Sequence, residues 1–133
     1  MRQTLSTQAV GLLKELHKLT GRQKYLFPNS RTPGTYMAAT TLNAALVRLG
    51  YAGKFSPHGF RATASTILNE MGHRPDWIER QLAHKERDNV RAIYNRAEHL
   101  AERGQMMQQW SDYIDALASG RGNVVPGRFG KAA

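Results

Sequence analysis

Four side chains in the middle of the chain have the types and spacing of a site that acts on a phosphate. His58 and Arg61 are three residues apart in the stretch SPHGFRATAS, His84 ends the triplet LAH, and Tyr94 follows ten residues later. An arginine can hold two phosphate oxygens at once, and a histidine can donate a hydrogen bond or move a proton. A tyrosine hydroxyl attacks a phosphodiester when its neighbours accept its proton or stabilise its anion. Together these groups suit phosphoryl transfer, in which catalysis is mainly positioning and charge stabilisation.

The first two of these residues lie at a predicted helix start. Ser56 is a favoured N-cap and Pro57 fits the first helical position. A helix N-terminus offers free N–H groups and a partial positive charge, which favour an anion. Residues at i and i+3 share a helix face, so His58 and Arg61 would meet the same ligand. Taken alone, this pattern fits an ordinary capped helix with two exposed polar residues equally well, and His84 and Tyr94 favour a site.

The remaining elements are predicted to be helices joined by short loops. Apolar periodicity predicts helices over residues 6–19, 39–49, 57–71, 76–82 and 100–118, and a further helix starting near Val90. Residues 25–28 are predicted to be extended and residues 29–35 to form an exposed loop. The predicted fold class is therefore mainly α.

Other side chains have simpler interpretations. Tyr25 and Tyr113 are predicted to be half-buried, and Met107, Trp110 and Ile114 to belong to the core. The remaining histidines, which have no motif around them, are predicted to be surface residues: His17, His73 and His99. No H-E-x-x-H or similar spacing is present, so the sequence predicts no metal site, and we expect no cofactor.

Charge is unevenly distributed along the chain, which has a formal net charge of +9. Residues 1–57 hold eight Lys or Arg against one acid, Glu15, whereas residues 58–119 are close to neutral. A basic half suits a polyanion such as DNA, although a basic surface that serves solubility explains the charge about as well. The chain has no cysteine and no apolar run long enough to span a bilayer, so we expect an intracellular protein without membrane contact.

The composite pattern resembles the catalytic part of the tyrosine recombinases, and the wording HGFRATAS, ERQLAH, VRAIYNRAEH and MMQQWSDYIDAL is similar to the prophage integrases of that family. The resemblance runs from Leu5 to about Leu117. It implies that Tyr94 is the nucleophile that forms a 3′-phosphotyrosyl link to DNA and that Arg61 binds the phosphate. His58 would be the acid–base residue, and His84 would hydrogen-bond the scissile phosphate.

The same resemblance implies what a complete enzyme of the family has besides these residues: a first catalytic arginine, a hairpin lysine, most of a small β-sheet and further DNA-binding domains. We expect these to lie upstream, so that residues 1–118 form the helical C-terminal portion of the catalytic domain and residues 119–133 a flexible basic tail. The isolated chain would then cleave DNA poorly. The family implies double-stranded attachment sites as partners, a homo-tetramer on DNA and a location in the bacterial cytoplasm, at the nucleoid.

Two alternatives remain open at this point. A non-catalytic helical DNA-binding module would also use short helices and a basic face, but it would have no need of Tyr94. A remnant that acts as a partner or decoy of an intact integrase would depend on the long last helix and the basic tail.

Overall fold

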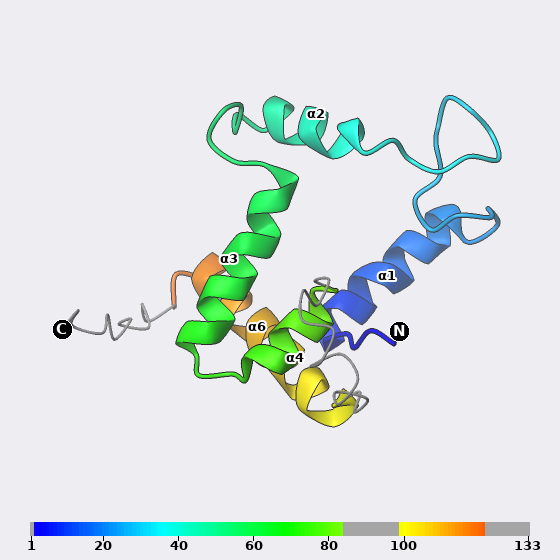
Figure 1. Cartoon of the computed structure of the whole chain (residues 1–133). Coiled ribbons are helices and arrows are strands. Elements are labelled where there is room, and N and C mark those ends of the chain that lie inside the picture. The colour runs from blue at the N-terminus through cyan, green and yellow to red at the C-terminus, as the bar shows by residue number, and fades with distance from the viewer. Residues whose placement is uncertain (1, 84–98, 122–133) are drawn as a thin grey trace, which may run out of the picture. The chain divides into compact units, whose positions relative to one another are not determined.

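The computed structural model describes residues 2–83 and 99–121, and the regular structure in these ranges is helical (Figure 1). The helices are α1 (Thr7–Thr20), α2 (Thr40–Arg48), α3 (Pro57–Glu70), α4 (Pro75–Gln81) and α6 (Leu100–Ala118). The β pairing found in the described ranges is an isolated bridge between Pro28 and Tyr36. The mainly α class is therefore confirmed, and the predicted helix bounds in these ranges lie within one residue of the observed ones. The helix predicted near Val90 falls outside the described residues.

The chain divides into two compact units. Unit 1 consists of Met1–Ser6 and Ala62–Ala133, and unit 2 consists of Thr7–Arg61. Helix α3 begins in unit 2 and continues into unit 1. The His58–Arg61 pair therefore belongs to unit 2, whereas the apolar core lies in unit 1. The predicted partial catalytic domain over residues 1–118 stays a prediction, and most of the predicted tail lies outside the described residues.

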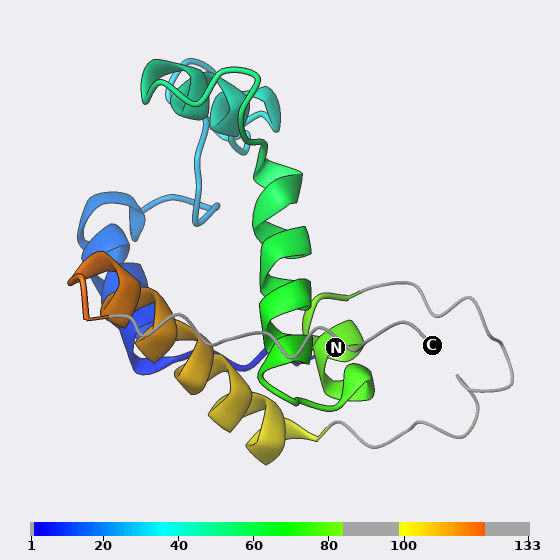
Figure 2. The same cartoon turned by 90° about the vertical axis from the view of Figure 1, so that its left-hand side faces the viewer.

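Unit 1 is built around three buried side chains, one from each of its described helices. Leu68 of α3 is 1% exposed, and Ile78 of α4 and Met106 of α6 are fully buried. Helix α4 packs against α6 (Figure 2). Gly72 adopts φ +83° after α3, and this left-handed conformation, which suits glycine, turns the chain from α3 toward α4. Half-buried apolar side chains surround the centre of this core: Met71, Trp77, Leu82, Met107 and Trp110.

The buried face of α6 differs from the predicted one. Arg103, Met106, Met107 and Trp110 follow the spacing i, i+3, i+4, i+7 of one helix face, and Arg103 and Met106 are fully buried. The prediction of Met107 and Trp110 as core residues is confirmed, but Ile114 is 44% exposed and was wrongly predicted to be core. The face begins with a charged residue, so apolar periodicity alone placed it too far toward the C-terminus.

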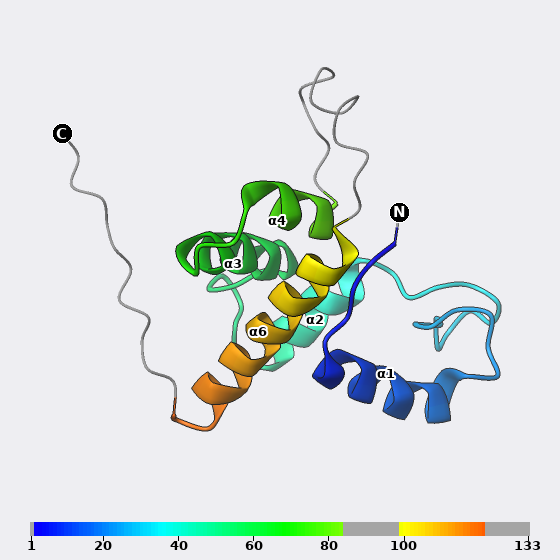
Figure 3. The same cartoon turned by 90° about the horizontal axis from the view of Figure 1, so that it is seen from below.

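An extended N-terminal segment, residues 2–6, lies along α6 (Figure 3). The Arg103 guanidinium donates to the Arg2 carbonyl oxygen at 2.9 Å through Nη2, and the Ser111 hydroxyl donates to Ser6 Oγ at 2.6 Å. Ser6 is 2% exposed. The segment thus completes unit 1 by supplying hydrogen-bond partners to α6.

Unit 2 is held together differently, since α1 and α2 contain no buried residue. The predicted exposed loop over residues 29–35 is confirmed, but the prediction of an extended stretch over residues 25–28 is wrong for residues 25–27, which form bends. Within this stretch Pro28 makes the isolated bridge to Tyr36. The Phe27 carbonyl accepts from Met37 N–H at 2.8 Å, and Asn29 Oδ1 accepts from Arg31 N–H at 2.9 Å, which closes the turn. The rings of Tyr25 and Tyr36 meet edge to face with centroids 5.7 Å apart.

Two of the three histidine predictions need correction, because His99, like His73, is half-buried and not a fully exposed surface residue. His17 is exposed, as predicted, but His73 is half-buried, and its Nε2 atom is buried with no hydrogen-bond partner found in the described structure. His73 follows Gly72 directly in the turn that joins α3 to α4, and its N–H donates to Leu68 O at 3.1 Å, which ties it to the core. Tyr25 and Tyr113 are half-buried, as predicted. Among the described residues, no helix has the length and apolar character to cross a membrane.

Truncating the core at Leu68 tests this description. We expect Leu68→Ala to lower the free energy of unfolding of unit 1 by about 2–5 kcal/mol, because it opens a cavity between three helices. Urea unfolding followed by Trp fluorescence would measure this. The matched control is Leu117→Ala, at a position that is 46% exposed on α6, for which we expect a loss below about 1 kcal/mol. Equal losses for the two variants would contradict the assigned core.

Candidate functional site

The start of α3 positions His58 and Arg61. The helix begins at Pro57, as predicted, and the Gly59 N–H donates to Ser56 Oγ at 3.2 Å and to the Ser56 carbonyl oxygen at 2.9 Å. Ser56 is therefore the N-cap that the sequence predicts. His58 and Arg61 follow within the first two turns, and both side chains are exposed. Their placement at a capped helix N-terminus is confirmed.

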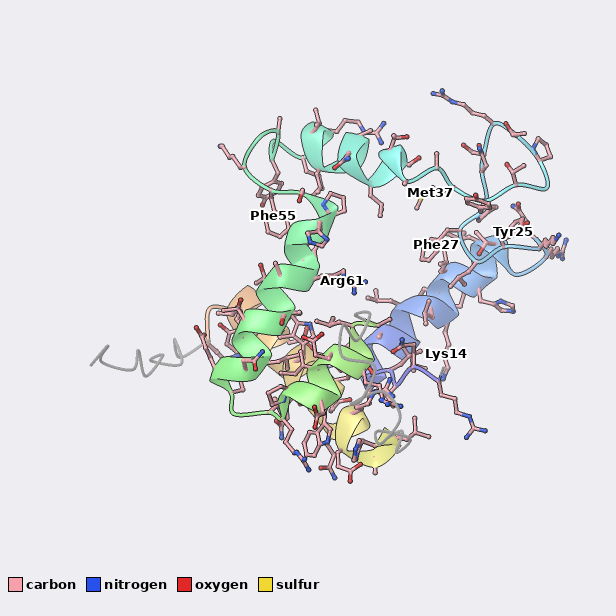
Figure 4. The ribbon with its side chains drawn as sticks, viewed as in Figure 1. Lys14, Tyr25, Phe27, Met37, Phe55 and Arg61 are labelled. Carbon is pink, nitrogen blue, oxygen red and sulfur yellow. The ribbon has the colours of Figure 1, made fainter. Side chains whose placement is uncertain are left out.

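Aromatic packing fixes the direction in which the chain enters this helix. The Phe55 and Phe60 rings meet edge to face with centroids 4.7 Å apart. A Cβ atom at Gly59 would lie 3.0 Å from Phe55 Cε2, so glycine allows the ring to approach the backbone. Phe55 and Arg61 project from different sides of the helix start (Figure 4). The packing that orients the helix is therefore separate from the Arg61 side chain, which is exposed.

The electrostatics of unit 2 are strongly positive. It contains eight Lys or Arg residues and one acid, Glu15. Glu15 forms an exposed pair with Lys18 at 2.6 Å, and a pair of this kind is screened by solvent and salt. Every base in the unit is exposed: Lys14, Lys18, Arg22, Lys24, Arg31, Arg48, Lys54 and Arg61. Such a density of exposed cations creates a field that attracts polyanions.

The other two predicted site residues, His84 and Tyr94, lie outside the described residues. The structure describes the residues that precede His84 in the chain. Helix α4 ends at Gln81, Leu82 packs against the core of unit 1, and Ala83 adopts φ +52°. The LAH triplet therefore begins with a half-buried leucine that packs on the core of unit 1. The convergence of Arg61, His58, His84 and Tyr94 on one phosphate stays a prediction.

A polar cluster beside this triplet was missed by the sequence analysis. Gln81 Oε1 accepts from Arg103 Nε at 3.0 Å and from Arg103 Nη2 at 2.8 Å, and Gln81 Nε2 donates to the Thr4 carbonyl oxygen at 2.9 Å. The available signal was an arginine at the first position of an i, i+3, i+4, i+7 stripe whose other members are apolar. That pattern indicates a buried arginine that needs acceptors.

Comparison with known proteins identifies the class. A helical chain that offers an H-x-x-R pair at a capped helix start, within a unit rich in exposed bases, is suited to binding a phosphate polymer. The chain belongs to the phage integrase family of tyrosine recombinases, because the family's model matches residues 1–100.

Relatives in bacteria and phages agree with this assignment. The chain is 43% identical over 116 residues to the prophage integrase IntA of Escherichia coli K12, which covers 87% of this chain and 28% of IntA. It is 42% identical over 122 residues to the prophage integrase IntZ of the same strain, 91% of this chain and 30% of IntZ. It is 46% identical over 115 residues to the integrase of Enterobacteria phage P4, 84% of this chain and 26% of that protein.

The chain thus spans less than a third of the length of these relatives. No solved structure matches it significantly.

The cap at Ser56 can be tested locally. We expect Ser56→Ala to destabilise the first turn of α3 by about 1 kcal/mol, because Gly59 N–H loses its side-chain acceptor. Native-state hydrogen exchange at the Gly59 amide should then become roughly fivefold faster. Ser30→Ala, in the exposed loop of residues 29–35, is the control and should leave this rate unchanged. An unchanged Gly59 rate in Ser56→Ala would contradict the capping role.

Proposed function

We propose that this chain is the phosphate-binding and nucleophile-bearing part of a site-specific tyrosine recombinase that cuts and rejoins double-stranded DNA. Tyr94 attacks the scissile phosphorus, its oxygen becomes bonded to the 3′-phosphate, and the 5′-oxygen of the next nucleotide leaves with a proton. Rejoining reverses this exchange with the 5′-hydroxyl of a new strand, so the bond energy is kept and no external energy source is needed.

Each of the other three residues has a distinct task in this proposal. Arg61 holds two non-bridging phosphate oxygens in bidentate fashion and stabilises the charge of the transition state. His58 acts as the acid–base residue that moves a proton at the reacting oxygens. His84 donates a hydrogen bond to the scissile phosphate. The substrate would be an attachment site, bound by a homo-tetramer in the cytoplasm at the nucleoid.

The observation that carries the proposal is the placement of His58 and Arg61 at a helix start that is capped by Ser56 and next to the packed rings of Phe55 and Phe60. This helix start belongs to a unit with eight exposed bases. A buried or uncapped H-x-x-R would present no phosphate site. Here the two side chains are exposed and share the end of the helix where N–H groups and the helix dipole favour an anion. Membership of the phage integrase family supports the assignment of this local geometry to a recombinase site.

Activity is best tested in a chain of the relatives' full length. The region of the phage P4 integrase that matches this chain would be exchanged for the corresponding residues of this chain, and recombination would be measured on the phage P4 integrase's own attachment DNA. We expect recombinant product and a covalent protein–DNA adduct. Tyr94→Phe in this chimera should abolish both and leave DNA affinity unchanged, because the phenol oxygen is lost and no DNA contact of the ring is altered.

The same experiment separates the alternatives. A chimera that folds and binds DNA, but gives no adduct, would contradict the catalytic proposal and favour a helical DNA-binding module. Recombination that persists in Tyr94→Phe would contradict the role of Tyr94. The unmodified phage P4 integrase, and its own variant without the nucleophile, provide the upper and lower reference rates.

The basic unit predicts how DNA binding depends on salt. If about half of the eight bases of unit 2 contact phosphates, a plot of log K against log salt for the isolated chain should have a slope of about −3.6, from roughly −0.9 per phosphate. If Lys14 and Lys24 are among these contacts, Lys14→Gln with Lys24→Gln should reduce the magnitude of the slope by about 1.8, or roughly 0.9 for each lost contact.

The matched control for this measurement is Arg74→Gln with Arg121→Gln, which removes the same charge from unit 1 and should change the slope much less. Binding titrations by fluorescence anisotropy at several salt concentrations give both values. Equal reductions by the two pairs would contradict DNA contact by unit 2.

A further inference from the structure

A single buried guanidinium joins three separate parts of unit 1. Arg103, the fourth residue of α6, is fully buried. Its Nε and Nη2 atoms donate to Gln81 Oε1 at the end of α4, and Nη2 also donates to Arg2 O at 2.9 Å and to Gln3 Oε1 at 3.2 Å in the N-terminal segment. Gln81 is held in turn by Thr4, whose hydroxyl donates to Gln81 Oε1 at 3.0 Å.

The position of this cluster in the chain is informative. Gln81 is the last residue of α4, and Arg103 N–H donates to the carbonyl oxygen of His99, the residue before α6, at 2.9 Å. Residues 84–98, which include His84 and Tyr94, connect these two points. The Arg103–Gln81 hydrogen bonds therefore join α4 to α6, the two helices between which the connection with two of the predicted catalytic residues runs in the sequence.

Two further features define the ends of this connection. Ala83 and His99 both have positive φ, +52° and +45°, and they are the non-glycine residues of the described structure that do. Such conformations persist where the surrounding structure holds them. The rings of Trp77 in α4 and His99 lie with centroids 6.3 Å apart, which is a second contact between the two ends. Both described ends of the connection, Ala83 and His99, therefore have constrained backbone conformations.

We propose that Arg103 is a positioning residue for the recombination reaction: through Gln81 and the N-terminal segment it fixes the separation and direction of the two ends of residues 84–98. This inference rests on the function proposed above, because it is His84 and Tyr94 whose presentation would depend on it. Fixing the ends of a connection reduces the range of conformations open to it. Arginine suits this task because its rigid fork can donate to several acceptors at once, which the single ammonium of lysine does not reproduce.

The absence of cysteine allows a distance measurement on the whole chain. Glu79→Cys on α4 and Ala101→Cys on α6, both exposed positions, would be spin-labelled, and the distance distribution between the labels would be measured by pulsed electron paramagnetic resonance. We expect a narrow distribution in the parent chain. Arg103→Lys and Gln81→Met should each broaden it at least twofold while the helical circular dichroism is retained. Arg121→Met, at an exposed arginine after α6, is the control and should leave it unchanged.

The second measurement uses the chimera with the phage P4 integrase and reports on chemistry. Arg103→Lys should lower the rate of covalent adduct formation at least tenfold and leave DNA affinity within twofold, since the fully buried Arg103 side chain has no surface with which to contact DNA. If Arg103 were needed for stability alone, Arg103→Lys would not slow adduct formation while keeping DNA affinity, at a temperature where the parent chimera and the variant are both folded.

The outcomes are distinguishable. Unchanged distance distributions in both variants, or broad distributions with normal adduct formation, overturn the positioning role. Loss of helical structure in both variants also overturns it, since Arg103 would then be required for folding and not for positioning. If the parent chimera gives no adduct but the distributions broaden as expected, the function proposed above fails and the anchoring of the two ends stands.

Discussion

Unit 1 depends on the hydrogen bonds that allow one positive charge, the guanidinium of Arg103, to be buried. Removing a guanidinium from water is costly unless its donors find acceptors, and Arg103 is fully buried. The acceptors described for it are amide and backbone oxygens of Gln81, Arg2 and Gln3, which come from three places in the sequence. Meeting this requirement brings the N-terminal segment, the end of α4 and the start of α6 together. The apolar contacts of Leu68, Ile78 and Met106 then fill the space between the helices.

The need of the buried Arg103 for hydrogen-bond acceptors also links the fold to the proposed chemistry. Phosphoryl transfer depends on placing a nucleophile and several charge-stabilising groups around one phosphorus atom. The H-x-x-R pair lies on a helix start that is oriented by a serine cap and by packing of Phe55 on Phe60. The stretch with His84 and Tyr94 is bounded by α4 and α6, which the arginine cluster joins. The H-x-x-R pair and the stretch with His84 and Tyr94 thus depend on different local interactions.

Much of this organisation could be predicted from the sequence. Helices follow from apolar periodicity together with Ser, Pro and Gly signals, and these are local properties that need no knowledge of the tertiary structure. The Arg103–Gln81 cluster could not be predicted, because its hydrogen bonds join residues 22 and about 100 positions apart in the chain. Ile114 was misassigned for a related reason: periodicity identifies a helix face, but the neighbours that cover it determine how far along the helix burial extends. The apolar stripe of α1, none of which is buried, makes the same point.

The central claim is that four side chains surround one phosphate, and a crystal structure of this chain grown with sulfate or phosphate tests it most directly. The distances to measure run from the anion to the Arg61 guanidinium, the imidazoles of His58 and His84, and the Tyr94 hydroxyl. The account predicts one anion with all four groups within about 2.6–3.2 Å of its oxygens. An anion held by Arg61 and His58 with His84 directed elsewhere, or no shared anion at all, would contradict it.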